Sequence, residues 1–353
     1  MPRRILVLNE RDLRNPRAGG AEVHLFEILK RLVSRGDEVT LLAASFRGSR
    51  REELVQGVRV RRLANRYLYY LAAPLAARRE AGKGSLDLVI DVLNKLPFLS
   101  PWFVPLPCFV IAHHLFGVTA FRQVALPLAL ATWLAERLVP AAYRSSVVLA
   151  ISPSTKQDLV ARGLPEGNVW VVPPGVDRDV YRPSAQAGGS RGMREPTILW
   201  VGRLEPYKRA DLAIDAVAGL RRRRPGLRLI VLGSGSAKSS LEKMVERRGL
   251  AGTVFFKGFI DEQEKVRWLQ RSDVLVHTSE KEGWGMTVIE AAACGTPSVA
   301  PDVAGLRDSI SDGRTGLLVP FGDSRALEDA LDAVLGDGDL RASLTAGCRE
   351  WAG

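Results

Sequence analysis

The sequence predicts an α/β protein with two doubly wound domains. Apolar β-type runs alternate with amphipathic helical runs twice along the 353 residues, a pattern that favours parallel sheets covered by helices. Between the two series lies a segment rich in Gly, Ser and Pro, which has no hydrophobic period and is typical of a linker. The length suffices for two domains, each with its own core. We therefore expect a first domain at 1–181, a linker at 182–196 and a second domain at 197–353.

The first domain opens with a βαβ unit. We expect a strand at 3–9, a glycine-containing loop at 16–22, an amphipathic helix at 23–36 and a strand at 37–44. Further strands are expected at 86–92, 107–114, 146–152 and 169–175, with a helix at 155–163. The uncharged stretch 97–121 has the length of a membrane span, but its prolines favour a buried strand with loops.

The second domain repeats the pattern. Strands are expected at 197–203, 227–233, 253–258, 274–279, 298–300 and 316–320. Helices are expected at 210–223, 239–249 and 262–272, between Trp284 and Gly295, and at 325–336. Ligands of doubly wound sheets bind beyond the carboxyl ends of the strands, so we expect the functional residues there.

Composition excludes several classes of function. The net charge of +11 lies almost entirely in the first 190 residues, but the tight cluster Arg221–Arg224 is explained by a solvated last helical turn. Standard nucleic-acid motifs do not occur, so we expect no nucleic-acid partner. The three scattered cysteines and an opening run typical of a strand rather than of a secretory signal favour the cytoplasm.

Two glutamates, Glu282 and Glu290, stand in the stretch SEKEGWGMTVIEAAACGTPSVA at 279–300. Glu290 is expected inside a helix and Glu282 in the loop before it. Even in one continuous helix they would lie roughly 12 Å apart, whereas the carboxyl pair of a glycoside hydrolase is about 5 to 9.5 Å apart. We therefore expect them to hold two ends of one long ligand, with the Gly283 and Gly285 backbone at its middle.

Cations and glycines mark two further strand ends. Arg203 ends the strand expected at 197–203, and Lys208 and Arg209 follow it; there they would neutralise a diphosphate, and a solvated basic turn is the alternative. Gly19 and Gly20 precede a helix whose N-terminal N–H groups suit an anion, although a plain turn has the same pattern. The dinucleotide fingerprint is absent.

Histidines and acidic pairs are weaker signals. His113 and His114 follow an apolar strand, where a histidine is more often a hydrogen-bonded residue at the edge of the core than a catalyst. Potential ligands do not occur at metal-binding spacing, so we expect no metal. Asp337 and Asp339, a D-x-D pair in a C-terminal turn, are the alternative if a cation proves necessary.

Together these motifs resemble the retaining GT-B glycosyltransferases of family 4. The matching segments are GGAE after the first strand, SPSTKQDLVARG…VVPPGVD at the domain junction, GRLEPYKR, the E-x7-E segment and DGRTGLLVP. The resemblance covers nearly the whole chain. It implies a GT-B fold, in which two Rossmann-like domains face each other across a cleft. It also implies transfer of a hexose, with retention of anomeric configuration, from a sugar nucleotide of GDP-mannose or UDP-hexose type to a hydroxyl acceptor, in cell-envelope glycan, glycolipid or polysaccharide synthesis.

The resemblance also implies roles for single residues. Arg203 and Lys208 would stabilise the departing diphosphate in place of a metal, so that no cofactor is needed. Glu282 would hold hydroxyls of the donor sugar, Glu290 would hold the ribose, and His113 or its neighbour would lie near the transferred sugar. The leaving phosphate would help to deprotonate the acceptor on the same face. Further contacts to the donor are expected from Gly19, Gly20, Phe259, Gly283, Trp284, Gly285, Met286 and Thr287.

The C-terminus differs from the family pattern, and two other functions remain as alternatives. The family usually continues into a helix that crosses back onto the first domain, and this helix is expected to be missing because the chain ends at GCREWAG. The alternatives to a transferase are a GT-B-type sugar-nucleotide epimerase or hydrolase and a non-catalytic sugar-nucleotide-binding protein.

The basic first half bears on the acceptor. The segment YLYYLAAPLAARR is preceded by Arg59, Arg61, Arg62 and Arg66 and closes on Arg78 and Arg79. A basic, aromatic, amphipathic segment of this type can lie on an anionic membrane. This interpretation implies a lipid-linked acceptor and a peripheral position at the inner face of the membrane. The alternative, a buried helix with solvated arginines, leaves a soluble acceptor open.

Overall fold

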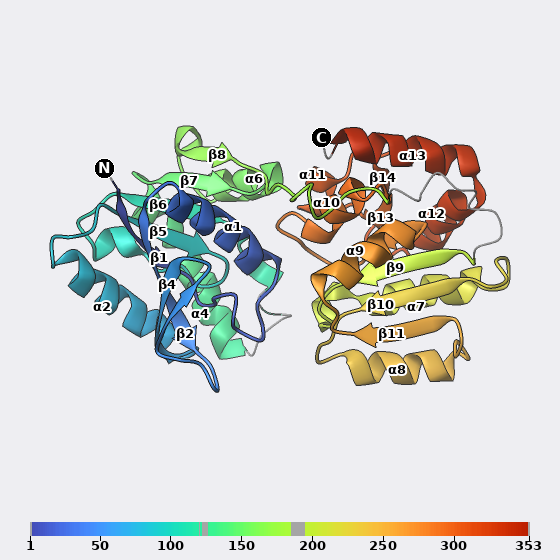
Figure 1. Cartoon of the computed structure of the whole chain (residues 1–353), viewed down its shortest axis with the longest axis horizontal. Helices are drawn as coiled ribbons and strands as arrows, with labels where there is room; N and C mark the ends of the chain where they lie inside the picture. Colours follow the sequence, from blue (N-terminus) through green and yellow to red (C-terminus); the bar gives the residue numbers. More distant parts are fainter. Residues whose placement is uncertain (1, 120, 122–125, 185–194, 352–353) are drawn as a thin grey trace. The chain divides into compact units, whose positions relative to one another are not determined.

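The computed structural model describes residues 2–119, 121, 126–184 and 195–351, and the chain divides into two compact units, 1–174 and 175–353 (Figure 1). The second unit begins earlier than the expected second domain. Tyr181 shows why, because its ring is buried in the core of the second unit beside Leu199 and Val288. Of the expected linker, residues 185–194 lie outside the described residues.

The first unit contains an eight-stranded sheet in the order β3-β4-β2-β1-β5-β6-β7-β8. Every pair is parallel except β3–β4, an edge hairpin that sequence analysis did not predict. Gln56 and Gly57 close it with φ of 49° and 82°, as a type I′ turn requires. The strands are β1 Arg4–Leu8, β2 Glu38–Ser45, β3 Glu52–Val55, β4 Val58–Asn65, β5 Leu88–Leu93, β6 Cys108–Ala112, β7 Val147–Ala150 and β8 Val169–Val171.

Helices cover both faces of this sheet. Alternate residues of a strand point to opposite faces, so Ile5 and Val7 of β1 pack with helix α1 while Leu6 and Leu8 pack with helix α2. The helices are α1 Gly20–Ser34, α2 Tyr69–Ala81, α4 Leu126–Glu136, α5 Val139–Tyr143 and α6 Pro153–Ala161, with short 3₁₀ turns η1 Ser100–Trp102, η2 Gly117–Thr119 and η3 Glu166–Asn168. Among the described residues, no helix is both long enough and apolar enough to cross a bilayer.

The second unit contains a parallel six-stranded sheet in the order β11-β10-β9-β12-β13-β14. Its strands are β9 Thr197–Val201, β10 Arg228–Leu232, β11 Val254–Gly258, β12 Val274–Val276, β13 Ser298–Pro301 and β14 Gly316–Val319. Its helices are η4 Pro206–Lys208, α7 Ala210–Leu220, α8 Lys238–Arg247, α9 Glu262–Arg271, α10 Met286–Ala293, α11 Leu306–Ser309, α12 Ser324–Gly336 and α13 Gly338–Trp351. Helices α11 and α13 were not predicted.

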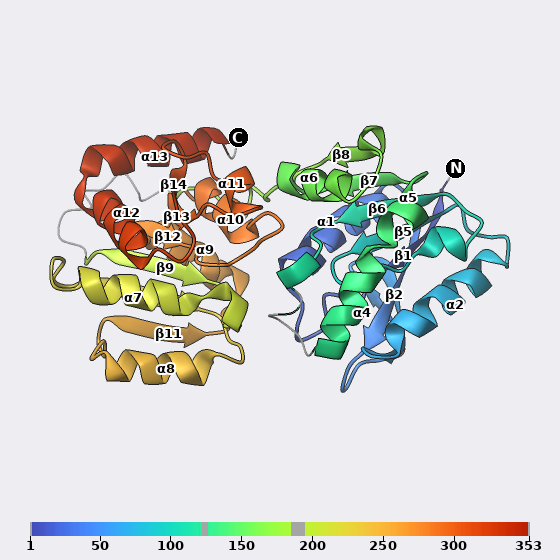
Figure 2. The same ribbon diagram turned by 180° about the vertical axis from the view of Figure 1, so that it is seen from behind.

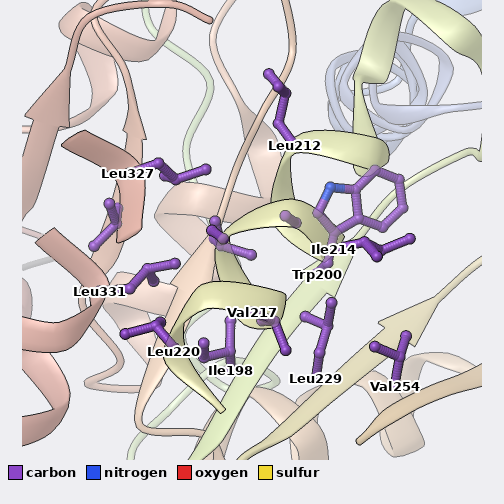
Figure 3. Packing of buried hydrophobic residues seen from close by; sticks show 14 of the residues in the cluster. Ile198, Trp200, Leu212, Ile214, Val217, Leu220, Leu229, Val254, Leu327 and Leu331 are labelled. Carbon is purple, nitrogen blue, oxygen red and sulfur yellow. The ribbon is translucent and has the colours of Figure 1, made fainter. Parts of the chain in front are cut away.

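The core of this unit lies on both faces of its sheet. Side chains of β9, α7 and α12 point at one another on one face, as Figure 3 shows for Trp200, Val217 and Leu331. Helices α9 and α10 cover the other face (Figures 1 and 2). Both units are therefore doubly wound, as predicted, and each has its own core.

Candidate active site

The two glutamates of the candidate site lie in helix α10 of the second unit and in the loop before it. Helix α10 starts at Met286 because Gly285 holds a φ of 91°, a left-handed conformation that glycine adopts without strain. Glu290 lies inside this helix and is buried, and Glu282 lies in the loop before it, as predicted. A Cβ atom at Gly285 would meet Leu306 Cδ2 at 2.9 Å, so the start of α10 packs closely on α11.

Lys208, Glu282 and His277 form one cluster. Lys208 Nζ donates a hydrogen bond to Glu282 Oε1, and His277 Nε2 lies 3.6 Å from the same oxygen. Burial alone would raise the pKa of Glu282, but Lys208 and His277 outweigh it and lower that pKa to about 2. Burial lowers the pKa of His277 to about 4, so this imidazole is neutral at neutral pH. The structure thus joins two predicted site residues and adds His277, which lies in the strand expected at 274–279.

Lys208 is held in place by backbone and side-chain contacts. Trp200 Nε1 donates to Thr278 Oγ1 over 3.0 Å, and that hydroxyl donates to the Lys208 carbonyl over 2.7 Å. Arg203 donates to the Tyr207 hydroxyl over 3.0 Å. Arg209 instead lies 2.8 Å from Asp211, so its charge is already paired within its own turn.

Glu290 has different neighbours. Lys265 of α9 lies 3.2 Å from its Oε2 atom, and the same ammonium lies 5.1 Å from the centroid of the Tyr181 ring. Tyr181 in turn donates to Glu262. Burial is the largest effect on Glu290 and raises its pKa even though Lys265 opposes it. Lys265 was missed in the sequence because a single lysine in a charged helix has no distinctive pattern.

The remaining donor-binding candidates of this unit differ in exposure. Trp284 is buried, and its indole N–H has no hydrogen-bond partner among the described residues. Phe259, directly after β11, is 88% exposed. Met286 and Thr287 form the first turn of α10, where backbone N–H groups are unsatisfied by the helix itself.

In the first unit, Gly19 and Gly20 lie at the start of α1. Glu22 accepts a hydrogen bond of 2.7 Å from the Gly19 N–H, so this helix start already holds a carboxylate of its own chain. An incoming phosphate would meet the remaining N–H groups only.

His113 is buried at the end of β6 and pairs with another histidine. Its Nε2 atom lies 3.2 Å from Nδ1 of His24 on α1, whereas its Nδ1 atom has no partner in the described part of the chain. Burial lowers the pKa of both groups, that of His24 to about 4. His114 is less buried and its ring contacts Phe116 edge-on at 5.0 Å.

Comparison with known proteins places these residues in a family. The family model described as Glycosyl transferases group 1 matches residues 184–351, and Glycosyltransferase Family 4 matches residues 18–180. A D-inositol 3-phosphate glycosyltransferase of Nocardia farcinica is 31% identical over 95% of this chain and 82% of the relative. The chain belongs to the group 1 glycosyltransferases. A second relative of the same name, from Paenarthrobacter aurescens, is 37% identical over 56% of the chain, which there spans about half of the relative's length.

Solved structures show that this glycosyltransferase has the GT-B fold. Sucrose-phosphate synthase from Thermosynechococcus elongatus has a TM-score of 0.82 and 22% identity, covering 99% of this chain and 94% of that one. Anabaena HepE, solved with UDP and glucose, has a TM-score of 0.77 and 20% identity over the same shares. At these identities the likeness concerns the fold alone.

The described residues of the glycosyltransferase contain no group of three or more His, Cys, Asp or Glu side chains that could hold a metal ion. Asp337 instead caps helix α13, because its carboxylate accepts hydrogen bonds from the backbone N–H groups of Asp339 and Leu340.

Two arginines of the basic segment in the first unit are not exposed as expected. Arg62 was expected to be either membrane-facing or solvated, but it is buried and bonded to Asp12 at 2.8 Å and to Glu53 at 3.0 Å. Arg61 is likewise paired, with Glu52 and Glu80. Both lie on β4, where alternation along the strand and the edge hairpin bring acidic partners that the sequence order did not reveal.

Polar residues at the ends of β1 and β5 were not predicted from the sequence. Glu10 follows β1, and Lys95 follows β5; their side chains meet at 2.6 Å. Tyr70 of α2 donates to the same Glu10 oxygen over 3.0 Å. The signal for Glu10 and Lys95 was their position two residues after a buried strand, which is where ligands of such sheets bind.

Proposed function

We propose that this glycosyltransferase moves a hexose from a nucleotide-diphosphate sugar to a hydroxyl acceptor with retention of anomeric configuration. The observation that carries the proposal is the cluster of Lys208, Glu282 and His277, with Glu290 farther along α10. It offers one cation for a diphosphate, one carboxylate for sugar hydroxyls and a second carboxylate for a ribose. The relatives named D-inositol 3-phosphate glycosyltransferase support the reaction class.

Each group has a chemical task in this reaction. Arg203 and Lys208 neutralise the diphosphate as its charge grows in the transition state, and the first N–H groups of α10 add to this. When the donor binds, Glu282 gives up its hydrogen bond with Lys208 and accepts hydrogen bonds from hydroxyls of the donor sugar. Glu290 accepts hydrogen bonds from the ribose. His113, a neutral imidazole, lies beside the transferred sugar. The bond between the anomeric carbon and the phosphate oxygen breaks as the acceptor oxygen bonds to the same face of that carbon, and the acceptor's proton passes to the departing phosphate.

The proposed chemistry needs no divalent metal. The test is transfer from GDP-mannose and UDP-hexoses, with and without acceptor, in buffer with a chelator. We expect transfer to persist and the product to keep the donor's anomeric configuration, read by NMR coupling constants. Inversion would contradict retention, and activity that requires manganese would contradict metal independence. Turnover of the donor without acceptor would favour an epimerase or hydrolase, and binding without turnover would favour a non-catalytic binder.

We also propose that the enzyme works on a lipid-linked acceptor at the cytoplasmic face of an anionic membrane, in envelope glycan, glycolipid or polysaccharide synthesis. Exposed apolar side chains at the start of α2 and along it support this: Tyr67 and Leu68, just before the helix, and Leu71 and Leu75, within it, are each more than half exposed. Arg78 and Arg79 are exposed at the end of the same helix. Such a segment suits the interface of an anionic bilayer.

A further inference from the structure

Helix α4 of the first unit exposes its leucines and buries its polar residues. Ala129, Thr132 and Glu136 form its buried side. The opposite side carries a leucine at every fourth position, which we call the leucine ridge: Leu126, Leu130 and Leu134 in the helix and Leu138 just after it are 69%, 45%, 50% and 42% exposed. A surface helix normally has its apolar stripe toward the core, so the leucine ridge has the character of a contact surface.

The orientation of α4 is fixed by its buried carboxylate. Glu136 accepts hydrogen bonds from the backbone N–H groups of Phe116 and Gly117, over 2.6 Å and 2.8 Å, and from Arg162 over 3.1 Å. Turning the helix to bury the leucine ridge would break these bonds and leave polar groups without partners. Figure 2 shows α4 in front of the sheet, and the leucine ridge stays on the exposed side of the helix.

A row of small residues lies beside the leucine ridge. Pro127, Ala131 and Ala135 each follow a leucine of the ridge, so they form the neighbouring row of the helix at the same four-residue spacing. Pro127 and Ala131 are exposed, and Ala135 is half-buried. This row is a groove next to a ridge of large side chains. Helices pack by placing the ridge of one in the groove of the other, so the exposed side of α4 matches a second helix.

We propose that two copies of this chain form a dimer by packing their α4 helices together. Each α4 carries both halves of a ridge-and-groove contact. In a pair related by a two-fold axis, the leucine ridge of each copy enters the groove of the other, so one surface serves both partners. Contact between rows of four-residue spacing sets the crossing angle of the two helices at about −50°. This inference goes beyond the transfer reaction and does not depend on it.

A bilayer is the other environment that accepts exposed leucines, but the charges of α4 do not favour it. A helix on an anionic membrane carries basic residues beside its apolar side, and α2 ends with two of them, Arg78 and Arg79. The sequence of α4, LPLALATWLAE, has a single charged residue, the buried Glu136. Arg137, just after the helix, lies over the Trp133 ring at 3.6 Å. A lipid surface also makes no use of a groove, so these features favour a second α4.

Sedimentation velocity of the full chain tests the proposal. One helix from each copy makes a small interface, so we expect a dimer with a Kd on the order of 1 to 10 µM. The contact is apolar, so the Kd should not rise when sodium chloride is increased to about 1 M, where exposed charges are screened. Monomers throughout a concentration series up to about 100 µM would overturn the proposal.

Variants on α4 test the ridge and the groove separately. Leu130→Ser/Leu134→Ser should weaken the dimer at least about a hundredfold, because four leucine side chains leave the interface of the two copies. Ala131→Phe fills the groove while the surface stays apolar, and it should weaken the dimer as well. Leu71→Ser/Leu75→Ser on α2 is the matched control, since these leucines are 70% and 60% exposed, and it should leave the dimer unchanged.

All of these changes lie at exposed positions, so urea unfolding should show each variant folded, with a midpoint close to that of the wild-type chain. A dimer that persists in either α4 variant, or that is lost in the α2 control, would contradict the proposal. Vesicles of neutral lipid test the bilayer. Sedimentation of the wild-type chain with them as a monomer, lost in Leu130→Ser/Leu134→Ser, would assign the leucine ridge to the membrane and refute the dimer.

A single cysteine locates the contact. Ala131 lies near the middle of the exposed side, so the two copies of this residue should meet close to the two-fold axis, where a disulfide needs Cα atoms about 4.4 to 6.8 Å apart. Ala131→Cys should form a linked dimer after mild oxidation. Ser239→Cys, at an exposed position of α8 in the second unit, is the control and should stay unlinked. No linkage through Ala131→Cys, or equal linkage in the control, would overturn the α4 contact.

Discussion

Glu282 and Glu290 stand in opposite electrostatic settings. Lys208 and His277 hold the pKa of Glu282 at about 2, whereas burial raises the pKa of Glu290 against a single lysine, Lys265. The charged form of Glu282 is therefore stabilised by groups of the chain itself, whereas the charged form of Glu290 is destabilised by burial and would gain from further hydrogen-bond donors. Hydroxyl donors of a ribose would supply them.

Alanine substitutions at the two glutamates should affect different steps of the reaction. Glu282→Ala should lower turnover strongly without weakening the binding of free nucleoside diphosphate. Glu290→Ala should weaken that binding by about 1 to 3 kcal/mol, the range for a lost hydrogen bond to a charged group. Titration calorimetry with the nucleotide and initial rates with the sugar nucleotide measure both. Equal losses of nucleotide affinity would contradict the assignment.

The two carboxylates should also shift stability with pH in opposite senses. Because the folded-state pKa of Glu282 lies below its ordinary value near 4.3, its contribution is full above that value and is lost as the pH falls toward about 2. Glu282→Gln should therefore lower the free energy of unfolding at pH 7, by on the order of 1 to 3 kcal/mol, with a smaller difference at pH 3.

Glu290 has a raised pKa, so its charged form opposes folding above the ordinary pKa. Glu290→Gln should leave stability at pH 7 unchanged or increased, and so serves as the control for Glu282→Gln. Urea unfolding at both pH values tests the pair. A loss of stability at pH 7 in Glu290→Gln would be inconsistent with this account.

Single residues were predictable where a motif or a strand end marked them. Lys208 and Glu282 were expected in the site, but their contact joins residues 74 positions apart and no local pattern encodes it. Lys265 and Lys95 are isolated lysines whose partners come from other elements, so only the folded chain reveals them. Their identification required the packing of α9 on α10 and of β1 on β5.

At the scale of elements, the start of α10 depends on one glycine. Gly285→Ala would place a methyl group 2.9 Å from Leu306 in a backbone with φ of 91°. Gly322→Ala is a matched control, because its φ is 82° and its Cβ atom would meet nothing within 4 Å. Both should lose about 1 kcal/mol or more from backbone strain.

Gly285→Ala should be the less stable of the two and should also weaken nucleotide binding, because it displaces the first turn of α10. Urea unfolding and nucleotide titration of both variants measure this. Equal stability and unchanged nucleotide affinity would show that the contact with α11 does not set the position of the helix.

Elements with strong periodicity were predictable and weakly patterned ones were not. The alternation of strands and helices predicted both sheets, because buried parallel strands are continuous apolar runs. The hairpin of β3 and β4 was missed because its residues are charged and lie at the edge of the sheet. Helix α13 was missed because glycines interrupt it, although Leu344 and Cys348 are buried.

At the scale of the whole molecule, the exposed side of α2 predicts membrane binding. The double variant Leu71→Ser/Leu75→Ser should reduce sedimentation with anionic vesicles at every salt concentration. Arg78→Gln/Arg79→Gln should reduce it mainly at low salt, since each arginine near the surface contributes about 1 kcal/mol through a screened interaction. Co-sedimentation with neutral and anionic vesicles measures both.

Arg222→Gln/Arg247→Gln removes two exposed arginines from the second unit and is the charge-matched control. It should leave vesicle binding unchanged. If it reduces binding as much as the α2 variants do, net charge rather than α2 is responsible. No sedimentation of the wild-type protein with anionic vesicles at low salt would refute the membrane proposal.

The pair of Lys208 and Glu282 also determines how dissolved ions act on the empty enzyme. A free ammonium group collects mobile anions from the buffer, and a nucleotide must compete with them. The charge of Lys208 is instead neutralised by Glu282 of the same chain. Buffer anions such as sulfate or phosphate should therefore bind to Lys208 only weakly. Glu282→Gln removes that internal counterion. The variant should become sensitive to inhibition by inorganic phosphate and sulfate at concentrations that leave the wild-type enzyme unaffected.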